Sequence, residues 1–316
     1  MAGRRRPRAE PGAPPVKTIQ RVTVPDLDPY TFHFDLRAKP LDAGANLDGR
    51  LAYLGRITAD PVQSNPVTVI QLALGALQLR DPGQLPLVSA VVEWLERWTD
   101  DRGLLAYRFP MPHTFPLDAP WYSCLAQGEA ASLLVRAGDV LGRPELFELA
   151  DRVIEPLLTP ESSLVAATAD GTVLQEYPTN PPSHVLNGWI TALFGLHDLA
   201  QAPREATAGT RRAGEAFDAG TATLETMLHL YRTPIGWSLY DLYPHPIPNT
   251  ASVAYQRLHV EQLRELHSLT KIETFATTAG DWERSLENPV LRLVAVGRKV
   301  AFRLVRPRSR RVKPRH

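Results

Sequence analysis

Apolar residues recur three and four positions apart through most of this chain, the spacing that places them on one face of an α-helix. Asn65 can cap such a helix, Pro66 suits its first turn, and apolar side chains follow from Val67 to Leu77. The same spacing predicts further helices over about residues 87–98, 121–138, 144–158, 185–200, 211–231 and 258–269. We therefore expect a mainly α-helical protein.

A few segments depart from that spacing and predict β-structure. Residues 30–36 alternate between polar and apolar side chains, as a half-buried strand does. Residues 164–168 and 173–176 flank the dipeptide Asp170-Gly171, which suits a type I′ turn, so they predict a β-hairpin inserted between helices.

The predicted architecture is an incomplete (α/α) toroid with inserted β-hairpins and a short N-terminal β segment, because four-helix bundles have shorter loops than these. A further short strand is expected over 237–242. The predicted divisions are a disordered leader (1–20), a short β and loop segment (21–60), the toroid catalytic domain (61–287) and a basic C-terminal tail (288–316).

Composition excludes several classes of protein. The 316 residues carry a formal net charge of +1, which gives no overall basic field, and we expect no nucleic-acid partner. The single cysteine, Cys124, cannot form an internal disulfide or a multi-cysteine zinc site. The N-terminus lacks the apolar core of a secretory signal, and no segment approaches the roughly 20 apolar residues of a membrane span. The sequence therefore predicts a cytoplasmic protein.

Basic charge gathers at the C-terminus, where no acidic residue follows Arg292. Residues 290–311 mix apolar and basic side chains, so they can lie on an anionic membrane surface or hold an acidic polymer. A terminal helix that packs on the core with a solvated basic end explains the same pattern.

Candidate chemistry lies at the ends of predicted elements, where sites are commonly built. Glu176 and Tyr177 end the predicted hairpin, Tyr240 precedes Asp241 in a predicted strand, and Tyr255 begins the last predicted helix of the core. A single tyrosine in such a position more often packs with its hydroxyl on a backbone carbonyl than serves in catalysis.

Taken together, five segments between about Trp121 and Thr270 resemble the C-terminal catalytic region of the glucuronyl C5-epimerases. They are Pro120-Trp121-Tyr122-Ser123-Cys124-Leu125-Ala126-Gln127-Gly128, Glu176-Tyr177-Pro178-Thr179, Val185-Leu186-Asn187-Gly188, Ser238-Leu239-Tyr240-Asp241-Leu242, and Tyr255 with His259, Gln262 and Leu263. No segment is specific alone, but their order and spacing agree with the family over about half of the chain.

The resemblance implies a metal-independent isomerase that needs no cofactor and converts glucuronate to iduronate in a uronic-acid-containing glycan. It implies catalytic roles for Glu176, Tyr177, Tyr240 and Tyr255. The expected substrate-binding residues are Tyr122, Gln127, Asn187, Asp241, Arg257 and His259. The family usually carries an arginine after Tyr-Asp-Leu, whereas Tyr243 stands here, and Arg257 is a candidate replacement for that charge.

Inversion at C5 requires removal of a proton α to a carboxylate and its return from the opposite face of the ring. We assign Tyr255 and Glu176 to the two faces, with Tyr177 and Tyr240 polarising the carboxylate or relaying protons. Three alternatives stay open: a uronate lyase, a glycoside hydrolase that uses Glu176 with Asp241, and a non-catalytic glycan-binding protein. A homodimer is also possible.

Overall fold

The computed structural model describes residues 33–111, 114–115 and 117–307 of the chain. Within these ranges the protein is mainly α-helical, as the sequence predicts. The helices are α1 (Ala38–Ala43), α2 (Leu47–Thr58), α3 (Pro66–Gln78), α4 (Leu85–Trp98), α5 (Cys124–Val140), α6 (Glu145–Leu158), α7 (Leu186–Ala200), α8 (Ala208–Met227), α9 (Val253–Thr270), α10 (Glu273–Glu287) and α11 (Pro289–Val305), with the 3-10 turns η1 (Pro82–Gln84) and η2 (Leu228–Tyr231). The strands β1 (Val165–Thr168) and β2 (Gly171–Leu174) pair as one antiparallel hairpin. The expected leader lies outside the described residues.

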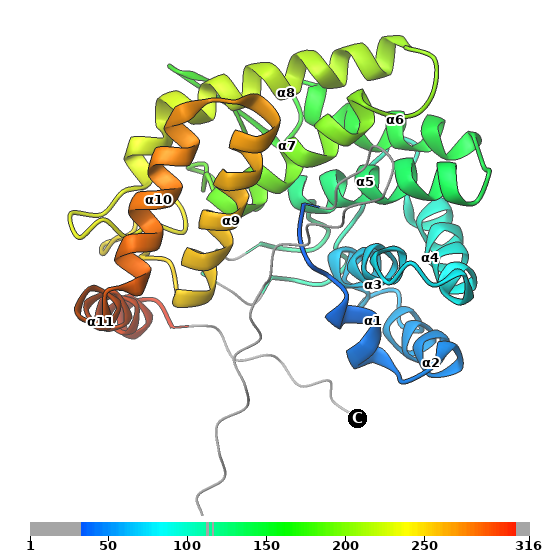
Figure 1. Ribbon diagram of the computed structural model, residues 1–316, viewed down its shortest axis with the longest axis horizontal. Coiled ribbons are helices and arrows are strands. Elements are labelled where there is room, and N and C mark those ends of the chain that lie inside the picture. The colour runs from blue at the N-terminus through cyan, green and yellow to red at the C-terminus, as the bar shows by residue number, and fades with distance from the viewer. Residues whose placement is uncertain (1–32, 112–113, 116, 308–316) are drawn as a thin grey trace, which may run out of the picture.

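The helices form two rows (Figure 1). In the first row α3 packs on α5, α5 on α7, and α7 on α9. The second row is α4, α6, α8 and α10, each packed on the preceding helix of the first row. The chain therefore alternates between the rows as a series of helical hairpins.

Helices α5 and α7 form the centre of this arrangement because both are buried on nearly every side. Their backbones approach closely at Gly128 and Gly195. A Cβ atom at Gly195 would overlap the backbone of Gly128, so glycine is required for this crossing.

The N-terminal region differs from the prediction. The strand expected over 30–36 lies partly outside the described residues, and residues 33–36 are irregular. The expected β and loop segment (21–60) is wrong over its described part, since that part contains α1 and α2. Asn46 caps α2 by accepting a hydrogen bond from the Gly49 amide at 3.0 Å, and Leu47, Leu51 and Leu54 follow at helical spacing.

The predicted hairpin is confirmed, but its turn is not type I′. Thr168 pairs with Gly171, so the loop consists of Ala169 and Asp170. A type I′ turn needs positive φ at both loop residues, whereas here Gly171 has the positive φ, at 136°.

The strand expected over 237–242 is also wrong. The segment is extended but forms only isolated bridges, Arg232 with Ser238 and Leu239 with Thr250. Prolines 244, 246 and 248 lack the amide hydrogen that a continuous ladder needs, so pairing cannot continue along this segment.

The C-terminal region contains two helices that extend the array. Helix α10 packs on α9, and α11 packs on α10 and more weakly on α9 (Figure 1). Asn288 caps α11 by accepting from the amides of Val290 and Leu291. Residues 289–305 of the expected basic tail are therefore folded against the body. No helix in the described ranges is both long and apolar enough to cross a membrane.

Candidate active site

A cavity of about 550 Å³ opens between the N-terminal segment and the first row of helices. Ligand pockets in proteins typically measure roughly 300–1,000 Å³, so it is large enough for a small number of sugar units. One wall is aromatic, with Tyr107 stacked on Trp121 at 3.9 Å between ring centroids and Phe109 edge-on to Trp121. Flat apolar surfaces of this kind suit the C–H faces of a pyranose ring.

Backbone hydrogen bonds bring the distant candidate segments together at this cavity. The amide of Cys124, which begins α5, donates to the carbonyl of Gln175 at the end of the hairpin. The amide of Leu186, which begins α7, donates to the carbonyl of Tyr240 at 3.1 Å. Residues 176, 186 and 240 are thereby fixed around the starts of α5 and α7.

Glu176, Tyr177 and Tyr240 form one hydrogen-bonded chain. The Tyr240 hydroxyl donates to the Tyr177 hydroxyl, and Tyr177 in turn donates to the Glu176 carboxylate. Asn187 donates to the same carboxyl group, with its Nδ2 3.2 Å from Oε2. Such a chain lets a proton move between Glu176 and the phenols without a large displacement of any side chain.

Burial raises the pKa of Glu176 to about 7, although the hydrogen bonds from Tyr177 and Asn187 favour its ionised form. A carboxyl group with this pKa can accept or give up a proton near neutral pH. The close approach of Gly188 encloses it, since a Cβ atom there would overlap the Glu176 side chain.

Tyr255, at the start of α9, lines the same cavity as Glu176 and Tyr177. Its ring lies 4.7 Å from that of Tyr240 in an edge-on arrangement. Tyr240 itself is buried behind the cavity, and the Lys299 ammonium of α11 lies 5.6 Å from its ring centroid. The structure therefore brings all four predicted catalytic residues together, with Tyr240 one layer behind the cavity wall.

Three ionisable residues that line the cavity were not predicted from the sequence: Glu129, Lys39 and Asp35, the last of which is paired with Arg37. Glu129 on α5 is buried, and burial raises its pKa to about 8. Its Oε1 accepts from Gln71 at 2.8 Å, while its Oε2 has no hydrogen-bond partner. Lys39 is the one described residue lining the cavity that carries a basic group. Because α5 is buried on nearly all sides, helical periodicity gives no sign that Glu129 faces a cavity.

Asn187 is the one predicted substrate-binding residue that lines the cavity. Gln127 is fully buried in the core, where its amide bonds the backbone of Leu105, Gly103 and Val153. Tyr122 lies away from the cavity, with its hydroxyl 3.2 Å from Arg102. Neither of these two side chains lines this cavity.

The other three predicted substrate-binding residues do not line this cavity either. Asp241 is buried and accepts hydrogen bonds from Asn249 and from the Tyr243 amide, so it cannot form a hydrolase pair with Glu176 across the cavity. His259 is buried against Ser238, and burial, aided by Lys299, lowers its pKa to about 3. Arg257 is not among the residues that line the cavity.

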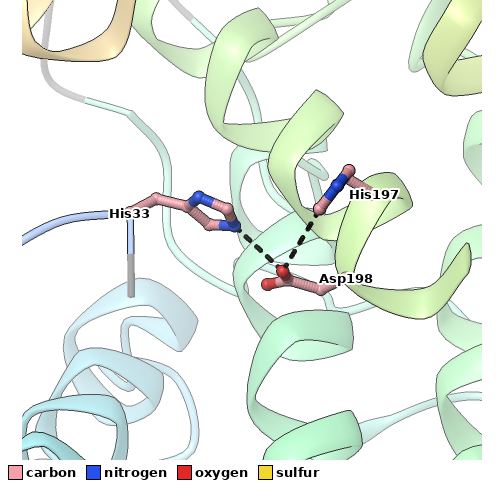
Figure 2. Close-up of side chains that lie close together, drawn as sticks. All are labelled: His33, His197 and Asp198. Atoms are coloured by element: carbon pink, nitrogen blue, oxygen red, sulfur yellow. Dashed lines mark hydrogen bonds and ion pairs between the residues drawn. The ribbon is translucent and has the colours of Figure 1, made fainter. Parts of the chain in front are cut away.

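One further polar cluster has the spacing of a metal site. Figure 2 shows the imidazoles of His33 and His197 directed at the Asp198 carboxylate, 2.9 Å and 3.7 Å from its Oδ1. The Arg136 guanidinium binds the other carboxylate oxygen, and Glu265 accepts from His33 at 3.1 Å. A cation already neutralises Asp198, so an ion-pair network explains the cluster better than a metal ligand set.

The fold and the cavity define a mainly helical protein with an acid–base site that contains two buried carboxyl groups, Glu176 and Glu129, and several tyrosines. A family described as D-glucuronyl C5-epimerase C-terminus matches residues 99–284. A D-glucuronyl C5-epimerase of Caenorhabditis elegans is 30% identical over 210 residues, which cover 61% of this chain and 34% of the relative. The chain belongs to the D-glucuronyl C5-epimerase C-terminal family. It matches about a third of the length of that curated relative.

Proposed function

We propose that the protein is an isomerase that inverts C5 of a uronic acid residue in a glycan, from the glucuronate to the iduronate configuration. The observation that carries this proposal is the joint placement of Glu176, Tyr177 and Tyr255 on one cavity, with Glu176 and Tyr177 hydrogen-bonded through to Tyr240. The rows of helical hairpins around the cavity support the interpretation of the fold as an incomplete (α/α) toroid.

The reaction needs one group to remove the C5 proton and a second to return one on the opposite face. We assign these roles to Glu176 and Tyr255. Glu176 has a pKa of about 7, so it exchanges protons readily at neutral pH, and Tyr177 and Tyr240 can restore its proton through their hydrogen-bonded chain. Burial raises the pKa of Tyr177 and of Tyr240 well above the ordinary value, so both phenols remain proton donors.

Negative charge accumulates on the substrate carboxylate as the C5 proton leaves, and the site must stabilise it. We assign this role to Lys39 and Glu129. Lys39 supplies a positive charge in place of the arginine that the sequence lacks after Leu242. Glu129 is protonated at neutral pH and has a free oxygen, so it can donate a hydrogen bond to the carboxylate. These side chains provide the acid, base and electrostatic roles without a metal ion.

The test is incorporation of deuterium at C5 when the protein is incubated with uronate polymers in deuterium oxide. Tyr255→Phe should abolish exchange while the circular dichroism stays that of the wild type. Tyr122→Phe is the matched control, because its hydroxyl lies off the cavity, and it should exchange normally. Chelator treatment should leave exchange unchanged. Retained exchange in Tyr255→Phe would remove that residue from the mechanism.

Product analysis separates the proposal from a uronate lyase, which shares the first proton abstraction. An epimerase leaves the polymer at its original length with altered configuration at C5. An unsaturated, ultraviolet-absorbing product would replace the epimerase with the lyase, and an absence of both turnover and exchange with intact glycan binding would leave a binding protein.

A further inference from the structure

Helix α11 exposes an unusual amount of apolar surface. Seven large hydrophobic side chains on this one helix are more than 40% exposed: Val290, Leu293, Val294, Val296, Val300, Leu304 and Val305. Elsewhere in the described residues only Leu41, Val62, Val140 and Leu230 reach that exposure, each on a different segment. Contiguous exposed apolar patches of this kind mark an interaction surface.

The exposed residues share one side of the helix. At about 3.6 residues per turn, they fall within one half of the helical circumference, together with Gly297 and Ala301. The opposite side carries Ala295 and Phe302, which are buried against the body of the protein. Ala295 packs near Trp237 and Ala251. The apolar half therefore faces away from the protein, although the helix itself is packed against the body of the protein.

Polar contacts hold the helix in this orientation. Lys299 donates to Asn249 at 2.7 Å, and Arg303 donates to Thr114 at 2.8 Å. The Phe302 ring lies edge-on to His245 with 5.0 Å between centroids. These contacts fix α11 at the margin of the helical array, beside α10 (Figure 1).

Charge along the same region has one sign. Helix α11 contains Arg292, Arg298, Lys299 and Arg303 and no acidic residue. Helical geometry places these cations along both borders of the exposed apolar half, between it and the buried side of the helix. Residues 306–316 follow directly with six further Arg or Lys residues and again no Asp or Glu.

We propose that the exposed apolar half of α11 docks the protein on an anionic membrane surface, with the helix lying in the plane of the interface. An amphipathic helix whose apolar face is bordered by basic side chains buries that face at the boundary of headgroups and acyl chains. Each Lys or Arg near an anionic leaflet adds further attraction, and the four basic side chains of α11 border its apolar half. A second copy of the chain would bring two positively charged faces together, which charge repulsion opposes.

The experiment is flotation of the full-length protein with vesicles of phosphatidylcholine alone and with vesicles containing about one third phosphatidylglycerol. The wild type should float with the anionic vesicles and stay at the bottom with the neutral ones. Leu293→Gln/Leu304→Gln should reduce partition into anionic vesicles at least about tenfold, because it removes two of the most exposed leucines from the inserted face. Val140→Gln/Leu230→Gln, at exposed positions off α11, is the matched control and should partition like the wild type.

Three results would overturn the proposal. Unchanged binding of Leu293→Gln/Leu304→Gln would show that charge alone attracts the protein and that the apolar face is not inserted. Equal partition of the wild type into both vesicles, or into neither, would remove the anionic surface as the partner. A wild-type dimer in sedimentation velocity without lipid that dissociates in the leucine variant would assign the face to a second copy. Deuterium exchange activity is not a readout here, so the outcome is independent of the proposed reaction.

Discussion

Replacement of Glu129 by glutamine tests whether a protonated carboxylic acid sits in the cavity. Glutamine has nearly the same shape, and its carbonyl can accept the hydrogen bond that Gln71 donates at 2.8 Å. It cannot ionise. Glu129→Gln therefore removes the titration of this group while it keeps the packing of α5, so any pH-dependent difference from the wild type reports the buried carboxyl group.

The magnitude follows from the pKa of Glu129, which burial raises from 4.5 to about 8. The folded state holds this proton more tightly than the unfolded state. Its contribution to stability is thus fully present below about pH 4.5 and is lost as the pH rises through 8. At 1.36 kcal/mol per pH unit, the loss by pH 9 is on the order of 5 kcal/mol as an upper bound, because water penetration and relaxation reduce such values.

The assay is urea unfolding of both proteins at about pH 5 and about pH 9. Glu129→Gln should match the wild type within about 1 kcal/mol at the lower pH and exceed it by several kcal/mol at the higher pH. Glu93→Gln, an exposed position on α4, is the matched control and should show no pH-dependent difference. If the Glu129→Gln difference is the same at both pH values, Glu129 is not a buried, protonated acid in the folded protein.

The remaining predictions concern the substrate, the base and the N-terminal segment. Lys39→Met should raise KM for a uronate polymer about tenfold and Lys39→Arg should restore it, measured by deuterium exchange; equal KM in all three proteins would remove the charge from substrate binding. Gly188→Ala should lower kcat at least about tenfold with normal circular dichroism, because the added Cβ displaces the Glu176 carboxyl group, and unchanged kcat would contradict that enclosure. Burial disfavours charge on His33, but Asp198 and Glu265 outweigh it and raise its pKa above 6.5. The stabilisation that protonated His33 contributes should therefore be lost as the pH rises through that higher pKa. The unfolding free energies of the wild type and of His33→Gln should then converge toward about pH 9. A difference in unfolding free energy that stays constant with pH would refute the ion pair.

The helical part of the fold was predictable because helix formation leaves a repeating mark in the sequence. Asn65 and Pro66 begin α3 as expected, and α4 to α8 appear close to their predicted ranges. Helices α1 and α2 were missed because glycines and aspartates surround their short apolar faces. The segment 237–242 was mistaken for a strand because its extended backbone bonds to irregular neighbours instead of a continuous partner.

The residues of the candidate site also differ in how well the sequence predicts their positions. Residues at the ends of elements, Glu176, Tyr177 and Tyr255, reach the cavity because the chain changes direction where they stand. Gln127 and His259 lie within helices, and nothing in their spacing distinguishes a side chain that faces the cavity from one that bonds the core backbone.

Glu129 shows why the chemistry of such a cavity cannot be read from residue types alone. A glutamate in a helix is ordinarily a solvated anion. Nothing in the sequence around Glu129 indicates that it differs from other helical glutamates. Its role depends on burial, which removes water, and on an oxygen with no protein partner. A protonated acid that faces a cavity can donate its hydrogen bond to water or to a ligand bound there. Titration of Glu129 therefore tests two things at once: its contribution to the stability of the fold, and the protonated state that the proposed reaction requires.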